Sequence, residues 1–165
     1  MTSFPTGTVT FLFSDIEGST RLWEQSPEKM EPALESHDRI MRQAISDAGG
    51  YIFATGGDAF SAAFQRPTEA IRAALGAQRE LNTMSDGDVP IRVRMALNSG
   101  TAHERDGDYF GPALNRTARL LAASNGSQVL VGLAAKELIQ DTLSRGGRPT
   151  DARCRAHPGS LAWAV

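Results

Sequence analysis

Two short apolar runs on either side of a glycine-rich turn constrain this fold most strongly. Residues 51–54 (YIFA) and 59–64 (AFSAAF) flank the sequence TGGD at 55–58. Such a pattern predicts a β-hairpin, because glycine accepts the backbone angles that a tight turn between two strands needs. A hairpin makes its two strands antiparallel neighbours. We therefore expect a sheet that is at least partly antiparallel.

The other segments alternate between strand-like and helix-like patterns. The β-branched and aromatic run at 8–14 and the alternation of apolar and polar residues at 91–97 predict strands, as does the short run at 128–131. Helical spacing of apolar residues predicts helices at 27–48, 67–81, 112–123 and 133–139. Ser26 would cap the first helix, Pro27 would begin it, and its regular part would start near Pro32. The helix at 112–123 would turn Leu114, Ala118 and Leu121 inward.

This order of elements, β-α-β-β-α-β-α-β-α, predicts an α+β fold. We expect a ferredoxin-like βαββαβ core, a mainly antiparallel sheet and helices packed on one side of it. One folded domain should span 1–143. Residues 144–165 lack apolar periodicity and are rich in Arg, Gly, Ala and Pro at 144–160, so we expect a divergent, poorly ordered tail there.

Composition excludes several classes of protein. The net charge of −2 gives no reason to expect a nucleic acid or a membrane surface as partner. A single cysteine, Cys154, cannot form an intrachain disulfide and favours a reducing compartment. The first residues lack the pattern of a signal peptide, and no segment has the roughly 20 apolar residues of a membrane span. We expect a cytoplasmic protein.

Acidic residues stand at two places where strands are predicted to end. Asp15 follows the first strand and precedes a polar turn that contains Gly18, Ser19 and Thr20, whose backbone N–H groups could hold phosphate oxygens. Asp58 stands at the tip of the hairpin. If the first strand and the hairpin are neighbours, the two carboxylates face one another and could bind Mg²⁺ or Mn²⁺.

A third polar pair lies on the helix predicted at 112–123. Asn115 and Arg119 are four residues apart and therefore share one helix face, away from the apolar side chains. An asparagine can orient a hydroxyl group, and an arginine can neutralise charge on a transferred phosphoryl group. Each feature alone has an ordinary structural explanation: Asp15 as a capping residue, Asp58 as a turn residue, and the helix pair as a solvated surface.

Taken together, three segments resemble a known family. TFLFSDIEGSTRLWE, GGYIFATGGDAFSAAF and DYFGPALNRTARL resemble the catalytic domain of class III adenylyl and guanylyl cyclases, over roughly residues 8–135. The similarity is closest to compact bacterial, often actinobacterial, forms. The resemblance implies that a purine nucleoside triphosphate is cyclised by its own 3′-hydroxyl, with release of pyrophosphate. Gly56–Phe60 also resembles the GGDEF signature of diguanylate cyclases, but Ala59 replaces its glutamate.

The resemblance also implies roles for particular residues. Two divalent metal ions, Mg²⁺ or Mn²⁺, would be bound by Asp15, Asp58 and the backbone carbonyl of Ile16. The triphosphate would be held by Gly18, Ser19 and Thr20. Asn115 and Arg119 would stabilise the transition state. Position 54 and Asp108 would contact the purine, and an aspartate at 108 goes with adenine, so ATP is the expected substrate and GTP the alternative.

The family works as a head-to-tail homodimer, in which one subunit supplies the metal aspartates and the other the purine and transition-state residues. Ala54 stands where the family usually has a lysine that contacts the purine. Losing such a contact typically costs roughly 1–3 kcal/mol, so we expect slow turnover or a blurred choice between ATP and GTP. No basic residue of the tail matches the family's usual phosphate contact, although Arg145 or Arg148 could substitute. The alternative is a pseudo-cyclase that binds nucleotide or dimerises without turnover.

Overall fold

The computed structural model describes residues 4–84, 89–143, 153–157 and 160–164. The strands are β1 (Thr8–Ile16), β2 (Tyr51–Gly56), β3 (Ala59–Phe64), β4 (Val93–Thr101), β5 (His103–Arg105), β6 (Asp108–Phe110), β7 (Gln128–Gly132), β8 (Arg153–His157) and β9 (Ser160–Ala164). The helices are α1 (Ser19–Gln25), α2 (Pro27–Asp47), α3 (Pro67–Met84), α4 (Pro112–Ala123) and α5 (Leu133–Leu143).

The described strands form a seven-stranded sheet with the order β2-β3-β1-β4-β7-β9-β8, and β5 and β6 form a separate hairpin. β1 lies inside the sheet, antiparallel to β3 on one side and to β4 on the other. Within the sheet only the β4–β7 pair is parallel. A buried hydrogen bond of 2.7 Å between the hydroxyl groups of Thr10 and Ser99 ties β1 to β4. The α+β class, the ferredoxin-like core and the β2–β3 hairpin are confirmed.

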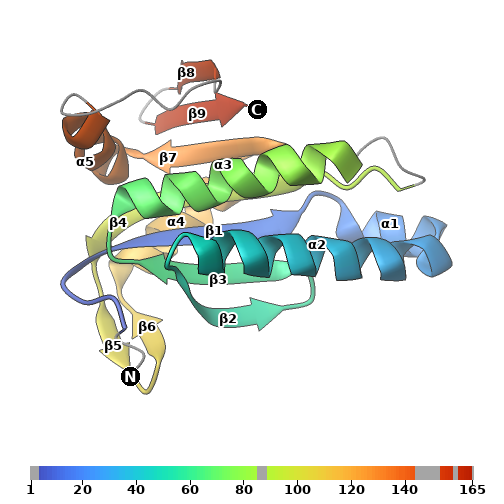
Figure 1. Cartoon of the computed structure of the whole chain (residues 1–165), viewed down its shortest axis with the longest axis horizontal. Helices are drawn as coiled ribbons and strands as arrows, with labels where there is room; N and C mark the ends of the chain where they lie inside the picture. Colours follow the sequence, from blue (N-terminus) through green and yellow to red (C-terminus); the bar gives the residue numbers. More distant parts are fainter. Residues whose placement is uncertain (1–3, 85–88, 144–152, 158–159, 165) are drawn as a thin grey trace.

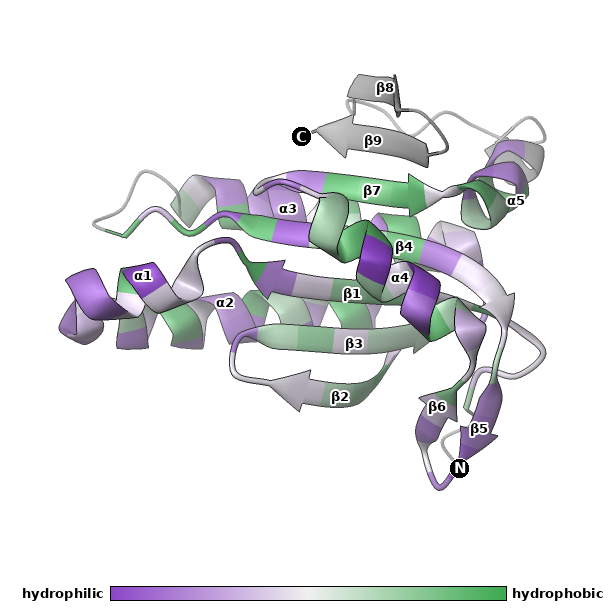
Figure 2. Ribbon diagram, turned by 180° about the vertical axis from the view of Figure 1, so that it is seen from behind, coloured by the Kyte–Doolittle hydropathy of each residue, from purple (hydrophilic) through white to green (hydrophobic). Residues whose placement is uncertain are grey.

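The two faces of the sheet carry different layers because side chains alternate along each strand. Leu12 and Ile16 of β1 join the core beneath α2, α3 and α5 (Figure 1). Val9 and Phe11 of β1 join a second core on the opposite face. α4 covers that face (Figure 2), and Tyr109 of the β5–β6 hairpin packs into the same core. The sequence predicts that all helices lie on one side of the sheet. The structure differs, because α4 packs on the other face.

The helix boundaries follow local chemistry. α2 begins at Pro27, as predicted, but runs through Pro32 as one helix, so its regular part starts earlier than expected. It ends where Gly49 adopts a φ of 78° and the Gly50 N–H donates to the carbonyl of Ile45 at 2.8 Å, a closure that glycine permits. α1 is an additional helix that the sequence analysis does not predict.

α4 has the predicted bounds but a different inward side. Ala113 and Thr117 are its buried residues, whereas Ala118 is exposed and Leu114 is half-buried. The predicted inward stripe is therefore wrong for Ala118, whereas Leu114 packs against the core as predicted. A close approach explains the choice of small residues: a β-carbon added at Gly100 of β4 would lie 2.9 Å from the Ala113 β-carbon. The helix sits almost directly on the backbone of β4.

The described part of the tail consists of two strands. β9 pairs antiparallel with β7, and β8 pairs with β9, so both belong to the main sheet. The predicted poor order of the tail stays a prediction. Positions 144–152, 158–159 and 165 lie outside the described residues, including the candidate Arg145 and Arg148, and the domain boundary at 143 stays a prediction. Among the described helices, none has the length and apolar character to cross a membrane.

Candidate active site

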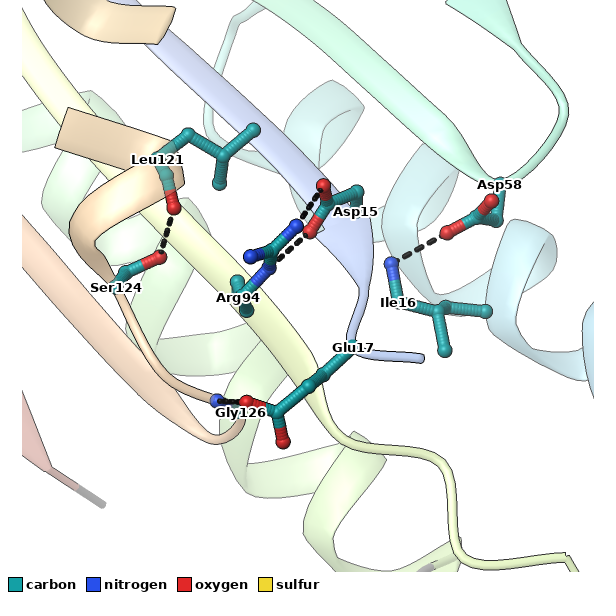
Figure 3. Close-up of polar contacts among 8 residues, drawn as sticks. All are labelled: Asp15, Ile16, Glu17, Asp58, Arg94, Leu121, Ser124 and Gly126. Carbon is teal, nitrogen blue, oxygen red and sulfur yellow. Dashed lines mark hydrogen bonds and ion pairs between the residues drawn. The ribbon is translucent and has the colours of Figure 1, made fainter. Parts of the chain in front are cut away.

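Asp15 and Asp58 lie at the same end of the sheet. Asp15 is the penultimate residue of β1, and Asp58 lies in the turn between β2 and β3. Because β3 pairs with β1, this turn comes to the end of β1. The backbone N–H of Ile16 donates a hydrogen bond to the Asp58 carboxylate (Figure 3). The structure thus brings together the three residues that were expected to bind metal.

An arginine from the next strand holds Asp15. Arg94 of β4 lies opposite Asp15 in the β1–β4 register. Its Nε donates to Oδ1 of Asp15 at 2.7 Å and its Nη2 to Oδ2 at 2.6 Å (Figure 3). The two side chains are 27% and 25% exposed. The hydrogen bond that Arg94 donates to Asp15 raises the pKa of Arg94, against the opposite effect of burial, so the guanidinium keeps its charge beside the carboxylate.

The backbone just after β1 is fixed by Glu17. The N–H of Glu17 donates to the carbonyl of Arg92 at 2.8 Å, and its Oε1 accepts from the N–H of Gly126 at 3.1 Å. A β-carbon at Gly126 would lie 2.5 Å from the β-carbon of Arg92 and 2.6 Å from Oε2 of Glu17. Glycine is therefore needed at 126 for the loop before β7 to approach the end of β1.

The turn expected to hold the triphosphate leads into α1. Gly18 has a φ of 66°, a conformation that favours glycine, and precedes Ser19 and Thr20 in the first turn of the helix. No side chain caps this helix start. The backbone N–H groups of its first turn have no intrahelical partner and can donate to anionic oxygens. The turn thus lies directly after the residues that bring the two aspartates together.

The two positions expected to contact the purine lie on neighbouring strands. Ala54 is exposed on β2, next to an irregularity in the β2–β3 pairing at 52–54. Asp108 is exposed at the start of β6. The residues adjacent to them, Phe53 and Tyr109, pack edge to face with ring centroids 5.1 Å apart. The structure therefore brings these two strands together, with a methyl group in place of a lysine on β2.

The β5–β6 hairpin is anchored by tyrosines. Tyr109 is buried, and its hydroxyl donates to the carbonyl of Pro5 at 2.8 Å. Burial raises the pKa of Tyr109 to about 12, with smaller contributions from Glu104 and Tyr51. The hydroxyl of Tyr51 donates to the carbonyl of Gly107 at 3.0 Å. These contacts set the position of Asp108.

Asn115 and Arg119 are exposed on α4, as their spacing predicts. Within the described part of the chain, neither residue forms a hydrogen bond or an ion pair with Asp15 or Asp58. The pair therefore forms a separate group from the two aspartates in a single chain.

The donor set at the end of β1 suits a hard cation. It offers two carboxylates and the carbonyl of Ile16, and no group of three or more His, Cys, Asp or Glu residues gathers among the described residues. Mg²⁺ is typically held by one or two carboxylates and completes its coordination with water and substrate phosphates. The residues present thus fit such a cation. Arg94 bonds both oxygens of Asp15, so a cation and Arg94 would compete for that carboxylate.

Comparisons with known proteins agree with this fold and arrangement. A family model described as the adenylate and guanylate cyclase catalytic domain matches residues 1–152, and the chain therefore belongs to this family. An uncharacterised protein of Mycobacterium tuberculosis is 40% identical over 150 residues, covering 90% of this chain and 49% of that protein. An adenylate cyclase of Lachancea kluyveri is 34% identical over 151 residues, covering 76% of this chain and 8% of that protein.

The solved structures give the same result. Adenylate cyclases from Trypanosoma brucei in their monomeric state match with a TM-score of 0.77 and 26% identity, over 98% of this chain and 90% of that one. The chain spans about half the length of the mycobacterial relative and less than a tenth of the fungal one. The likeness therefore concerns the catalytic domain.

Arg94 is the site residue that sequence reasoning missed. The alternation at 91–97 marks it only as part of the more polar side of a strand. The one available signal was a charged side chain between two buried residues, Val93 and Met95. Its partner Asp15 is 79 residues away in the sequence, so the pairing depends on the register between β1 and β4.

Proposed function

We propose that this domain converts ATP to cyclic AMP and pyrophosphate, by attack of the ribose 3′-hydroxyl on the α-phosphate. The observation that carries the proposal is the hydrogen bond from the Ile16 N–H to the Asp58 carboxylate, which places Asp58 beside the backbone that follows Asp15 and just before the uncapped turn at Gly18. Two carboxylates beside free backbone N–H groups form a site for a cation together with a polyphosphate.

The chain's own groups divide the work. Asp15, Asp58 and the carbonyl of Ile16 would hold two divalent cations, Mg²⁺ or Mn²⁺, which when bound lower the pKa of the attacking hydroxyl and neutralise charge on the phosphates. Ser19 and Thr20 would direct their backbone N–H groups at phosphate oxygens. Arg94, released in part from Asp15, would add a guanidinium that matches phosphate geometry.

We further propose a head-to-tail homodimer. Asn115 and Arg119 make no contact with the aspartates among the described residues, so one chain presents two halves of a site rather than a whole one. In a two-fold dimer the α4 pair of one subunit can face the aspartates of the other. Arg119 would then neutralise the charge that develops on the phosphates, and Asn115 would orient the ribose.

Adenine is the base that the purine positions favour. The Asp108 carboxylate can accept from the N6 amino group of adenine, whereas guanine presents the acceptor O6 at that place. Ala54 contributes no donor, and we therefore expect slow turnover. Ala54 also favours the second candidate, a pseudo-cyclase that binds nucleotide or dimerises without turnover.

The deciding experiment measures cyclic AMP and cyclic GMP made by the purified protein with Mn²⁺ or Mg²⁺. Asp58→Ala should lower cyclic AMP production roughly 100-fold or more, because it removes a metal carboxylate. The matched control is Glu31→Ala, which removes an exposed carboxylate on α2. Sedimentation should show both variants as dimers like the wild type.

Each alternative has its own outcome. Wild-type cyclic AMP production in Asp58→Ala would refute the metal assignment. A folded wild-type dimer that makes neither product would leave the pseudo-cyclase as the function. Cyclic GMP in excess of cyclic AMP would refute the role proposed for Asp108.

A further inference from the structure

A pocket of about 510 Å³ is lined by residues of α4, the start of α5, β4 and the end of β7. Its size is within the range of roughly 300–1,000 Å³ found for small-molecule sites. Arg119 of α4 is the one residue that it shares with the proposed catalytic set. Neither aspartate at the end of β1 lines it.

A buried amide lines this pocket. Asn98 of β4 is only 6% exposed. A β-carbon at Gly132 would lie 2.5 Å from Oδ1 of Asn98, so the glycine makes room for this amide. The side-chain amide of Asn98 can both donate and accept hydrogen bonds, so it can bind a polar ligand in the pocket.

The start of α5 forms another wall. Leu133 and Ala134, the first two residues of this eleven-residue helix, line the pocket. The first turn contains no acidic residue. Its unpaired N–H groups and the positive end of the helix dipole favour an anion at this place.

The charged side chains point to the same ligand class. Arg116 and Arg119 are three residues apart on α4, and both line the pocket. Neither forms an ion pair within the described part of the chain. Glu137 is the single acidic residue that lines the pocket, so the lining side chains carry a net positive charge. Leu120 and Leu133 add apolar surface, and Leu133 is 53% exposed.

We propose that this pocket binds a small organic anion, with its charged head between Arg116, the Asn98 amide and the first turn of α5, and its apolar body against Leu120 and Leu133. The head is a carboxylate or a phosphate monoester, since both accept from arginine and from backbone N–H groups. A bound anion draws the Arg119 guanidinium into the pocket. It therefore lowers cyclase turnover, a consequence that rests on the proposed function.

Binding is tested first on the protein alone, without nucleotide or metal. Backbone amide resonances are followed by NMR during titration with benzoate, phenyl phosphate and benzamide. Benzoate or phenyl phosphate should shift the amides of residues 132–134 and the side-chain amide of Asn98 in a saturable way, and the tighter of the two identifies the head group. Neutral benzamide should not. Equal binding of benzamide, or shifts centred elsewhere, would overturn the proposal.

Two surface variants should change the affinity for the anion in opposite directions. Arg116→Gln should weaken binding of the anion about fivefold, because an exposed charge pair contributes roughly 1 kcal/mol and that energy corresponds to about fivefold in affinity. Glu137→Gln should tighten it about threefold, because a repulsive carboxylate is removed. Arg72→Gln, an exposed charge change on α3, is the matched control and should have no effect. Equal affinities for Arg116→Gln and Arg72→Gln would overturn the proposal.

The effect of the bound anion on the rate of cyclic AMP formation is measured in a separate assay. In a preparation that makes cyclic AMP, benzoate should lower the rate in the wild type and do so less in Arg116→Gln. Binding without any change in rate would refute the coupling through Arg119 and leave the pocket in place. Because the titration needs no turnover, loss of the proposed function and loss of the pocket give different results.

Discussion

Replacing Arg94 by methionine tests the ion pair at the end of β1. The change removes both hydrogen bonds to Asp15 and keeps a side chain of similar length. The Asp15 carboxylate, three-quarters buried, then loses its only cation among the described residues. We expect a clear loss of folding stability at neutral pH.

The magnitude follows from the geometry. Hydrogen bonds to charged groups contribute about 1.5–3 kcal/mol each, and their contributions are not additive when they join the same two ions. Both side chains are about a quarter exposed, so water screens part of the interaction. We therefore expect a loss of about 2 kcal/mol for the pair as a whole. In a domain of this length that lowers Tm by about 4–8 °C.

Urea denaturation followed by circular dichroism measures the change in unfolding free energy, provided that the slope of this free energy against urea concentration stays constant. Arg92→Met is the matched control, since Arg92 is an exposed arginine two residues earlier and forms no side-chain ion pair in the described structure. A cycle that adds Asp15→Asn should give a coupling of about 1–2 kcal/mol. Equal stability of Arg94→Met and Arg92→Met would show that the pair does not stabilise the fold and refute this reasoning.

Three further predictions concern single sites. Ala54→Lys should raise ATP turnover by about one decade if position 54 faces the purine, and an unchanged rate in the cyclic AMP assay would refute that role. Burial raises the pKa of Tyr109 to about 12, so the stability that its neutral form contributes is complete below pH 10 and is lost as the pH rises towards 12. The wild type should therefore lose about 2–3 kcal/mol of folding stability in alkaline denaturation, and Tyr109→Phe should not show this loss. Gly50→Ala should destabilise the fold by about 2 kcal/mol or more in the same urea assay, because its β-carbon would lie 2.4 Å from the buried ring of Phe64. Gly76→Ala in α3 should instead stabilise the fold by about 0.5–1 kcal/mol, because its β-carbon would meet nothing within 4 Å.

Local patterns predicted the elements whose signals are contained within a few residues. The β2–β3 hairpin follows from glycines between apolar runs, and the bounds of α4 follow from Pro112 and its helical spacing. β5 and β6 were missed because three residues are too few to show a period. α4 was assigned to the wrong side of the sheet, since periodicity shows which residues are apolar but not which face of a sheet they meet.

The site shows the same division. That Asp15 and Asp58 would lie at the same end of the sheet could be inferred, because both stand at ends of strands that are neighbours in a ferredoxin-like core. The roles of these residues, and of Asn115 and Arg119, stay predictions that the assays above test. Arg94 could not be found, because its partner is set by a register between strands 79 residues apart. Long-range register is fixed by the packing of both faces together, which no local pattern contains.

The position of β1 inside the sheet has a consequence for how the chain acquires its structure. β1 is formed by residues 8–16, but one of its two neighbours, β4, ends at Thr101, and the Thr10–Ser99 hydrogen bond spans 89 positions. At ribosomal speeds of about 5–20 residues per second, β4 is synthesised on the order of 10 s after β1. During this interval Val9, Phe11 and Leu12 lie on an unpaired strand edge, which is a template for aggregation. Contacts of such long sequence separation also slow refolding, so the step that closes the sheet at β4 is the one at which chaperones would have most effect on yield.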